Sequence, residues 1–352
     1  MLENNLLVSF AEPILITGAG GFIGSRVVEI LLNYGFSNLR CFVRASSNLT
    51  YLNNLITTST NNQIKILTGN LLSPEDCKRA TEKVSVVFHL AAGVEKTFPG
   101  CYMNSVVATR NLLNSFIENK ALKRFVNISS IAVYSNRDTN NGGVLDETCE
   151  VDREPVLRHE AYVFGKVKQD ELLLDYARRF NLPYVIVRPG EVFGPGKRKI
   201  SGRVGIDTFG IFLHLGGRNQ VPLTYVDNCA EAIVLAGIKK GVDGKVFNVV
   251  DDNLPSSKKF LKMYKKNVDN FWSVYIPYRM SYFLCYLWEK YSAQSNGQLP
   301  PAFNRKQCIA GWKNVRYSNR KVKEELGWKP RIPIDEALRR YFEYMKRSET
   351  NK

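Results

Sequence analysis

The chain has 352 residues, of which 44% are hydrophobic and 23% are charged, and its formal net charge is +16. These values belong to a globular protein that can bury a large core, and the lack of internal repeats or biased segments excludes the repeat and low-complexity classes. The basic balance favours anionic ligands, but the basic residues are spread along the chain without interleaved aromatics. We therefore expect no nucleic-acid partner.

The seven cysteines are scattered, and none of them forms a Cys-x-x-Cys pair. This pattern predicts reduced thiols in a cytoplasmic protein, with neither a disulfide framework nor a metal site. Residues 1–10 lack the basic start and apolar block of a secretory leader, so none is expected. Neither His159 nor His214 has metal-ligand spacing, and His89 is expected to be a packed histidine at the end of a strand.

Residues 12–188 alternate between strand-like apolar runs and helical patterns, which is typical of βαβ units around a parallel sheet. Strands are expected at 14–16, 39–43, 64–67, 84–90, 124–128 and 184–187, and helices at 74–82, 103–118 and 162–180. The predicted fold class is α/β, a Rossmann-type doubly wound parallel sheet. A helix within 225–237 and a strand at 245–250 follow a loop-rich region. Residues 10–188 and 219–250 are assigned to this domain, and residues 189–218 and 251–346 to a smaller, discontinuous C-terminal substrate lobe.

Residues 271–288 are strongly aromatic, but Pro277 and Arg279 interrupt them, and the run that follows is too short to span a bilayer. We expect a lobe helix packed over the substrate cleft. A peripheral, interfacial helix in contact with a membrane is the alternative.

A glycine-rich turn stands between the first strand and the first helix. Gly18, Gly21 and Gly24 recur at three-residue spacing after the apolar run 14–16, and helical periodicity begins at Arg26. Unpaired N–H groups and the helix dipole at such a turn suit a pyrophosphate. Glycine is required because a Cβ would block the turn or the approach of the phosphate. The sequence therefore predicts a dinucleotide site.

Tyr162 and Lys166 lie four residues apart at the start of a predicted helix and thus on one face of it. A lysine ammonium beside the phenol, with a positively charged nicotinamide nearby, favours the phenolate and lowers a pKa that is ordinarily near 10. Ser130 follows the fifth strand, whose carboxyl end faces the ligand cleft, so its hydroxyl can contact a substrate oxygen. The same Tyr-x-x-x-Lys spacing occurs at Tyr286 and Tyr317, so placement, not spacing, singles out Tyr162.

The end of the second strand carries Arg44 where an acidic residue would grip the ribose hydroxyls of NAD. Arg44 suits a 2′-phosphate, so NADP is the expected cofactor, with NAD as the alternative. Asn70 stands near the expected adenine pocket, where its amide oxygen can accept a hydrogen bond.

Several motifs together resemble those of extended short-chain dehydrogenase/reductases, the NAD(P)-dependent epimerase/dehydratase family. They are TGAGGFIG at 17–24, FHLAA at 88–92, residues 104–113, SS at 129–130, Tyr162…Lys166, RPG at 188–190, YVDN at 225–228 and ELGWKP at 325–330. The N-terminal half is similar to the dihydroflavonol-reductase-like and sugar-epimerase-like branch. In the family an aspartate usually stands where this chain has Asn70.

The resemblance implies that Ser130, Tyr162 and Lys166 form the catalytic triad, with Lys166 also holding the nicotinamide ribose. The expected cofactor-binding residues are Gly18, Gly21, Phe22, Ile23, Arg44, Asn70, Leu71, Leu90, Ala91, Ala92, Tyr162, Lys166 and Pro189. The expected substrate-binding residues are Ser130, Glu191 and Arg203.

The resemblance also implies a hydride transfer between nicotinamide and a substrate carbinol carbon. We expect an epimerase or oxidoreductase acting on a nucleotide-sugar in polysaccharide or surface-glycan synthesis, since the basic loop with residues 197–199 and Arg203 can meet a diphosphate. The alternatives are an NADPH-dependent ketone- or sterol-type reductase and a non-catalytic NADP-sensing protein. A homodimer formed through helices that flank the sheet is expected from the family.

Overall fold

The fold is built on a sheet of seven parallel strands in the order β12-β7-β5-β4-β1-β2-β3. The structure, a computed structural model, describes residues 5–58, 63–117, 121–197, 200–208, 210–296 and 298–350. The strands are β1 (Ile14–Thr17), β2 (Asn38–Val43), β3 (Gln63–Thr68), β4 (Val86–His89), β5 (Arg124–Ile128), β7 (Tyr184–Pro189) and β12 (Lys245–Val249). The predicted doubly wound α/β sheet is confirmed.

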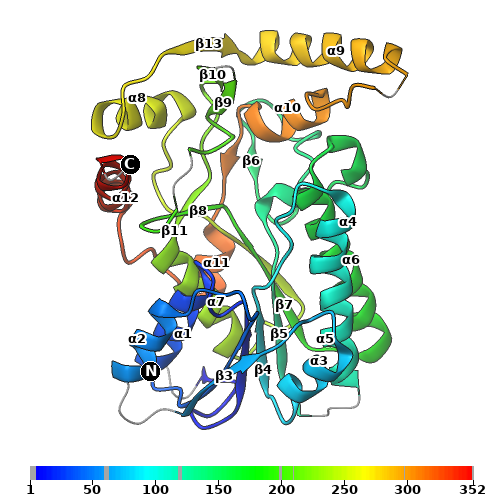
Figure 1. The fold of residues 1–352 in the computed structure, drawn as a ribbon, viewed down its shortest axis with the longest axis vertical. Coiled ribbons are helices and arrows are strands. Elements are labelled where there is room, and N and C mark those ends of the chain that lie inside the picture. The colour runs from blue at the N-terminus through cyan, green and yellow to red at the C-terminus, as the bar shows by residue number, and fades with distance from the viewer. Residues whose placement is uncertain are drawn as a thin grey trace.

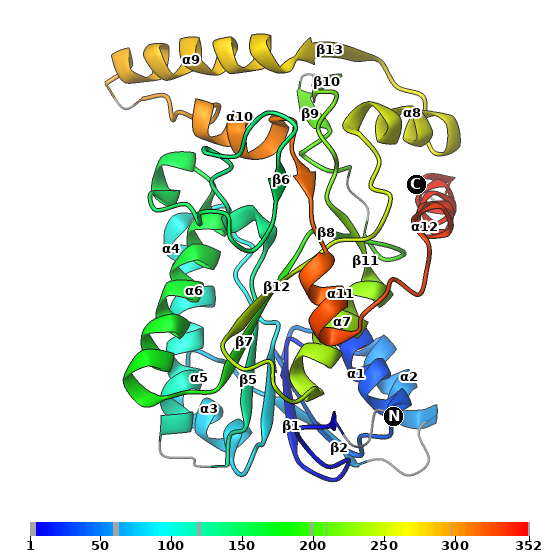
Figure 2. The same ribbon diagram turned by 180° about the vertical axis from the view of Figure 1, so that it is seen from behind.

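Alternate side chains of each strand enter two separate cores, which explains why the strands read as continuous apolar runs. Ile14 and Ile16 pack into one core with α1 (Gly24–Asn33), α2 (Thr50–Thr58), α7 (Val226–Ile238) and α11 (Arg320–Leu326). Leu15 packs into the other core with α3 (Pro74–Thr81), α5 (Ala108–Ile117) and α6 (Ala161–Phe180). Figures 1 and 2 show these two helical layers on either side of the sheet.

The connection from β3 to β4 reverses the direction in which the sheet grows, because β4 joins β1 on the side opposite β2. A crevice forms at such a switch point, outside the carboxyl ends of the strands, and ligands of doubly wound sheets bind there. The glycine turn after β1 therefore stands at the place where the topology leaves room for a ligand.

The lobe covers this edge of the sheet with short strands and helices (Figure 1). Its strands are β9 (Gly205–Thr208), β10 (Ile211–Gly216) and β13 (Ser273–Pro277) in one sheet, β8 (Glu191–Phe193) with β11 (Leu223–Tyr225), and β6 (Val144–Leu145) with β14 (Arg316–Tyr317). Its helices are α8 (Ser257–Asn267), α9 (Tyr278–Gln294), α10 (Arg305–Trp312) and α12 (Ile334–Thr350). The short helix α4 (Phe98–Cys101) lies instead against α6, beside the sheet (Figure 1). Two apolar clusters hold it together, one around α8 and α12 and one between β10, β13, α9 and α10.

Three features differ from the expectations. The segment predicted as a helix at 103–118 begins with a π-helical stretch, Tyr102–Val107, before α5, and its residue 118 lies outside the described residues. Residues 320–328 fall in the range assigned to the lobe, yet Val322, Leu326 and Trp328 pack in the same core as β1 and α7. The reason lies in the tertiary structure: α11 packs beside α7 and covers apolar side chains of this core that α7 does not cover.

The third difference concerns residues 271–288. They form β13 and most of α9 along the edge of the lobe farthest from the seven-stranded sheet (Figures 1 and 2). No residue of α9 is among the described residues that line the cavities holding Tyr162, so the expected packing over the substrate cleft is not observed. Within the described part of the chain, no helix is long and apolar enough to cross a bilayer.

Candidate active site

The glycine turn has the shape that a pyrophosphate requires. Gly18 has a φ of +71°, and a Cβ added at Gly24 would lie 2.1 Å from the Gly18 carbonyl oxygen, so neither position tolerates a side chain. Helix α1 has no side-chain cap, and among the described residues nothing accepts the backbone N–H groups of Phe22 and Ile23. These two donors point out of a helix N-terminus, where an anion is favoured. The turn fits the dinucleotide.

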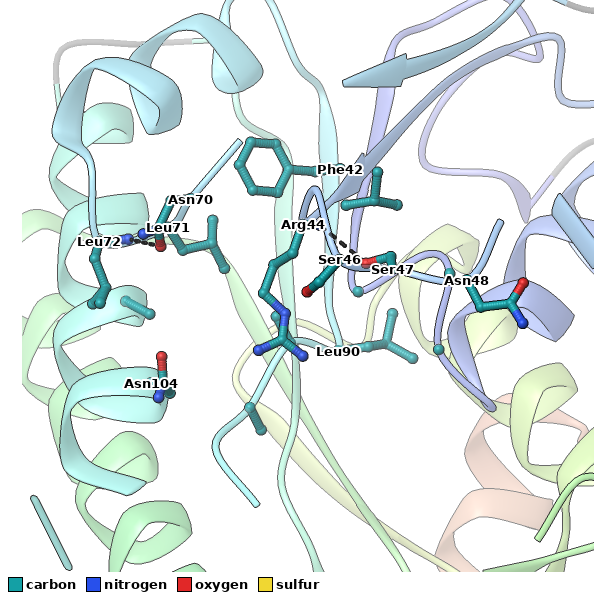
Figure 3. Close-up of a pocket in the computed structure, with 17 residues that line it drawn as sticks. Phe42, Arg44, Ser46, Ser47, Asn48, Asn70, Leu71, Leu72, Leu90 and Asn104 are labelled. Carbon is teal, nitrogen blue, oxygen red and sulfur yellow. Dashed lines mark hydrogen bonds between the residues drawn. The ribbon is translucent and has the colours of Figure 1, made fainter. Parts of the chain in front are cut away.

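A cavity of about 410 Å³, the glycine-turn cavity, opens between this turn and the ends of β2, β3 and β4. Figure 3 shows Arg44 projecting into it between the segments that carry Asn70 and Asn48. Arg44 is the one charged residue in the described lining, which contains no carboxylate. The oxygen Oδ1 of Asn70 accepts the backbone N–H of Leu72 at 3.0 Å, so one of its lone pairs is already used.

Two further cavities of about 500 Å³ each lie next to one another, and the first of them adjoins the turn. The central cavity has the turn on one side and Ser130, Tyr162 and Glu191 on the other. The lobe cavity shares Ala132, Tyr162, Glu191 and Arg203 with it and extends under α10. Tyr162 thus lies in the wall between a space next to the dinucleotide turn and a space enclosed by the lobe.

Tyr162 is held at the first turn of α6 and hydrogen-bonds to Ser130, which stands two residues after the end of β5. Burial raises the pKa of Tyr162 to about 12, against the Ser130 hydrogen bond, which lowers it, while the nearby Asp170 carboxylate adds to the rise. We expected Lys166 to lower the pKa of Tyr162, but Lys166 is not among the protein groups that shift this pKa. The physical reason is that burial disfavours the phenolate more than one hydrogen bond favours it.

Lys166 is buried, and its ammonium is directed to the carboxyl end of β5 and not to the phenol. Its Nζ donates to the Ile128 carbonyl at 2.6 Å and to Gln169 Oε1 at 3.0 Å. Burial lowers the pKa of Lys166 to about 8, although the Asp170 carboxylate opposes this. Helical spacing placed Lys166 and Tyr162 on one face, but the lysine's acceptors come from a strand and from its own helix.

Asp170 joins the end of β5 to α6 in a buried polar cluster. Its carboxylate accepts from Asn127 Nδ2 at 2.9 Å, from Ser129 Oγ at 2.8 Å and from Arg188 Nη2 at 3.1 Å. The Ser129 hydroxyl is therefore used in this buried cluster, while the adjacent Ser130 lines the central cavity. The cluster fixes the strand end that carries Ser130 against the helix that carries Tyr162.

His89 is a packed strand-end histidine, as expected. Its Nδ1 pairs with Thr17 Oγ1 at 2.8 Å and its Nε2 with Thr109 Oγ1 at 2.9 Å. Burial, reinforced by the Lys166 charge, lowers the pKa of His89 from 6.5 to about 3. The imidazole thus stays neutral and links β1, β4 and α5.

This shift predicts a pH dependence of stability. Below pH 6.5 His89 becomes protonated in the unfolded chain, whereas in the folded protein it stays neutral down to about pH 3. The free energy of unfolding therefore falls as the pH falls through this window. His89→Asn removes the titrating group, and the wild-type curve is expected to be steeper by about 1.4 kcal/mol per pH unit. Urea unfolding between pH 7 and pH 4 measures this slope. Parallel curves for the two proteins would contradict the assignment.

The structure brings most of the predicted site residues to these three cavities. The glycine-turn and central cavities are lined by Gly18, Gly21, Phe22, Ile23, Arg44, Asn70, Leu71, Leu90, Ala91, Ala92, Ser130, Tyr162, Glu191 and Arg203. The described linings do not include Lys166 or Pro189. Lys166 donates to the carbonyl of Ile128, and Ile128 is a lining residue of the central cavity. Pro189 is buried at the end of β7, one residue before the lining residue Gly190.

The two predicted substrate residues are held from the lobe. The Glu191 carboxylate accepts a short hydrogen bond from Ser201, and Arg203 Nη1 donates to the Ala310 carbonyl at 2.9 Å and to Tyr317 Oη at 3.0 Å. Lys197 Nζ donates to the Val192 carbonyl at 2.7 Å. Residues 198–199 of the basic loop lie outside the described residues.

Sequence reasoning missed many lining residues, and four polar ones among them stand out. Asn104 lines the glycine-turn cavity from the π-helical stretch, and Lys96, Arg158 and Glu160 line the lobe cavity. Asn104 lies inside residues 104–113, which match the family pattern, so that match could have identified it as a site residue. The other three come from irregular segments, where no periodicity marks the direction of a side chain.

Comparison with known proteins gives the family. The sequence model described as "NAD dependent epimerase/dehydratase family" matches residues 14–249. The chain is 28% identical over 284 residues to a dTDP-D-glucose 4,6-dehydratase of Dictyostelium discoideum, covering 74% of this chain and 64% of that protein. It is 24% identical over 355 residues to a decarboxylating sterol-4-alpha-carboxylate 3-dehydrogenase of Mus musculus, covering 95% and 91% of the two chains.

Solved structures share the fold over almost the whole length. A UDP-glucuronic acid 4-epimerase from Bacillus cereus in complex with NAD superposes with a TM-score of 0.70 at 21% identity, covering 96% of this chain and 99% of that one. A UDP-glucose 4-epimerase from Thermotoga maritima superposes with a TM-score of 0.68 at 21% identity and covers the same shares. With the glycine turn, the sheet order and the family match together, the chain belongs to the NAD-dependent epimerase/dehydratase family of extended short-chain dehydrogenase/reductases and is an enzyme that uses a nicotinamide cofactor on a small-molecule substrate.

Proposed function

We propose that this enzyme transfers a hydride between NADP and a carbinol carbon of a nucleotide-sugar-type substrate, with Tyr162 as the acid and base. The observation that carries the proposal is the position of Tyr162, which lines the central cavity together with Ser130. Tyr162 lies in the wall between the central cavity, which adjoins the glycine turn, and the lobe cavity. A proton-transfer group belongs at such a junction, within reach of both ligands.

The protein groups have distinct tasks in this scheme. Ser130 hydrogen-bonds to the substrate oxygen and to the phenol, and Tyr162 moves the proton at that oxygen. Lys166, whose ammonium is held by the Ile128 carbonyl in this structure, turns toward the cavity to hold the nicotinamide ribose. A bound, oxidised nicotinamide would supply the hydride acceptor, and its positive charge would favour the Tyr162 phenolate. Glycine-turn N–H groups at Phe22 and Ile23 bind the pyrophosphate.

The charge in the lobe cavity supports a polyhydroxylated, phosphorylated substrate. Its lining includes the bases Lys96, Arg158 and Arg203 and the acids Glu95, Glu160 and Glu191, and Arg158 is paired with Glu160. Bases pair with phosphate oxygens, and carboxylates accept hydrogen bonds from sugar hydroxyls. Such a substrate agrees with a role in polysaccharide or surface-glycan synthesis. Mass spectrometry of the nucleotide that co-purifies, followed by a panel of UDP- and dTDP-sugars monitored at the nicotinamide absorbance, tests this directly.

The preference for NADP rests on Arg44, since no carboxylate lines the described part of the glycine-turn cavity. Arg44→Asp is expected to weaken NADP binding about tenfold or more, because a hydrogen-bonded charge pair is lost, and to strengthen NAD binding, because an acid accepts from the ribose hydroxyls. Titration of both nucleotides measures the ratio of their affinities.

The exposed Lys65→Asp on β3 is the matched control for Arg44→Asp. It changes the net charge equally but lies outside the described lining of the cavity. An unchanged NADP-to-NAD ratio in Arg44→Asp, or the same change in the control, would show that Arg44 does not select the cofactor and would remove the ground for NADP.

A ketone- or sterol-type reductase is the second candidate, and one observation favours it. An apolar cavity of about 480 Å³, lined by α9, β10 and neighbouring lobe residues, shares Ile206, Phe303 and Trp312 with the lobe cavity. Turnover of apolar ketones or sterols without turnover of any nucleotide-sugar would select this candidate. A non-catalytic NADP sensor would be indicated if Tyr162→Phe left the biological activity unchanged.

Two finer points complete the proposal. A homodimer through the helices that flank the sheet is tested by sedimentation. A cytoplasmic location agrees with the seven cysteines, which are all free thiols.

A further inference from the structure

Helix α9 presents an apolar stripe to the outside of the molecule. The stripe consists of Met280, Phe283, Leu284, Leu287 and Tyr291, which are 45–59% exposed. Their spacing of three, four, seven and eleven residues from Met280 places all five on one face of the helix. A solvated lobe helix would carry polar residues on this face.

A neighbouring face of α9, about 120° from the stripe around the helix axis, fixes the direction of the stripe. Ser281, Cys285 and Ser292 are its buried residues, and Cys285 packs with Ile276, Cys308 and Trp312. The helix is therefore seated on the lobe in one orientation, and the stripe is not the face that the fold needs for its own core.

The apolar surface continues from α9 onto β13. Val274 and Tyr275 are exposed, and Trp272, just before the strand, is 75% exposed. Tryptophan and tyrosine combine an apolar ring with a polar group, which is why they are enriched where membrane meets water. We call β13, Trp272 and the stripe of α9 the aromatic edge.

A basic helix adjoins the aromatic edge. Helix α8 contains five lysines and no acid, and four of them, Lys258, Lys259, Lys262 and Lys266, are exposed. The fifth, Lys265, donates to Ser273 Oγ at 2.7 Å and thereby ties α8 to β13. Residues 254–294 hold seven basic residues against two acidic ones, and one of the acids, Glu289, is paired with Arg305.

We propose that the aromatic edge docks on a bilayer surface that contains anionic lipid, with the lysines of α8 against the headgroups. Neither element crosses the bilayer. A second copy of this chain fits less well, because each copy has a net charge of +16 and would bring a second set of lysines to the contact. An anionic surface instead complements both the apolar stripe and the charge.

The apolar cavity beside α9 agrees with this orientation. Leu284, Leu287 and Tyr291 belong both to the stripe and to the cavity's lining, and no charged residue is in the described lining. A bilayer over α9 would therefore cover apolar surface that the lobe itself leaves uncovered. This contact lies outside the active site and does not depend on the identity of the substrate.

Flotation with two kinds of vesicles tests the proposal: phosphatidylcholine alone, and phosphatidylcholine mixed with phosphatidylglycerol. The full chain is expected to bind the mixed vesicles, and added salt is expected to weaken binding. The double variant Phe283→Ser/Leu287→Ser should lose affinity about tenfold or more, because two large side chains no longer enter the interface. Phe180→Ser is the apolar control: Phe180 is 40% exposed on α6, away from this edge, and its substitution should leave binding unchanged.

Charge reversal supplies an independent arm. Lys259→Glu/Lys262→Glu should reduce binding to the mixed vesicles about tenfold, whereas Lys65→Glu/Lys78→Glu, with the same change in net charge, should have little effect. Absence of vesicle binding would overturn the proposal, as would equal losses in the two lysine pairs or retained binding in Phe283→Ser/Leu287→Ser. Self-association in sedimentation that the apolar variant abolishes, without vesicle binding, would assign the edge to a second copy.

Discussion

Tyr162→Phe is expected to slow hydride transfer about 10²- to 10⁴-fold, the range over which a positioned acid or base acts. The substitution removes only the phenolic oxygen that hydrogen-bonds to Ser130 and leaves the ring in its place between the central and lobe cavities. Affinity for the nicotinamide nucleotide should change by less than about tenfold, since one hydrogen bond contributes about 1 kcal/mol. Single-turnover absorbance of the nicotinamide gives the rate, and nucleotide titration gives the affinity.

The matched control is Tyr286→Phe. Tyr286 and Lys290 repeat the Tyr-x-x-x-Lys spacing in α9. Neither residue is in the described lining of the central cavity or of the lobe cavity. A normal rate in this control and a slow rate in Tyr162→Phe would separate placement from spacing. Comparable rates in wild type and Tyr162→Phe would remove Tyr162 from the chemistry, while the fold and the glycine turn would be unaffected.

Asp170→Leu is expected to destabilise the protein by about 3–5 kcal/mol, because it leaves the buried Arg188 without its carboxylate. Asn127 and Ser129 lose an acceptor in the same step. Urea denaturation measures the loss. The ion pair is not itself a large source of stability, because burying two charges costs about as much as their attraction returns.

Two further variants isolate the orphaned charge as the cause. Asp175→Leu removes an exposed carboxylate from the same helix, whose partners Arg178 and Arg179 are also exposed, and should cost less than about 1 kcal/mol. Asp170→Leu/Arg188→Met removes both charges and should recover part of the lost stability. If the double variant is no more stable than Asp170→Leu, lost packing and not the unpaired guanidinium is responsible.

Local patterns were sufficient for the sheet and for the dinucleotide corner. Apolar runs separated by helical periodicity depend on the residues within each segment, and both survive in the structure as buried strands and their covering helices. The spacing of Gly18, Gly21 and Gly24 is likewise a property of one turn, where a Cβ at Gly24 would meet the Gly18 carbonyl. Arg44 was found because the end of β2 is a fixed distance along the chain from that turn.

The partners of buried polar groups were beyond such reasoning. Asp170 is bonded to residues 43 and 41 positions away, and nothing near it in the chain distinguishes it from the exposed Asp175. Lys166 shares a helical face with Tyr162, yet its ammonium is held by the Ile128 carbonyl. Burial, and not the nearby lysine, decides that the pKa of Tyr162 is raised. The spacing of residues along the chain does not reveal how deeply a side chain is buried.

By itself the sequence determined the strands of the parallel sheet, the glycine corner and the residue types gathered at the carboxyl edge of the sheet. Only the tertiary structure decided that Ser129 is hydrogen-bonded to Asp170, where the lysine is directed, and that α9 lies along an outer edge with its apolar face outward. The physical reason is range: periodicity and turn chemistry act over a few residues, whereas burial and hydrogen bonding of polar groups depend on segments that only folding brings together.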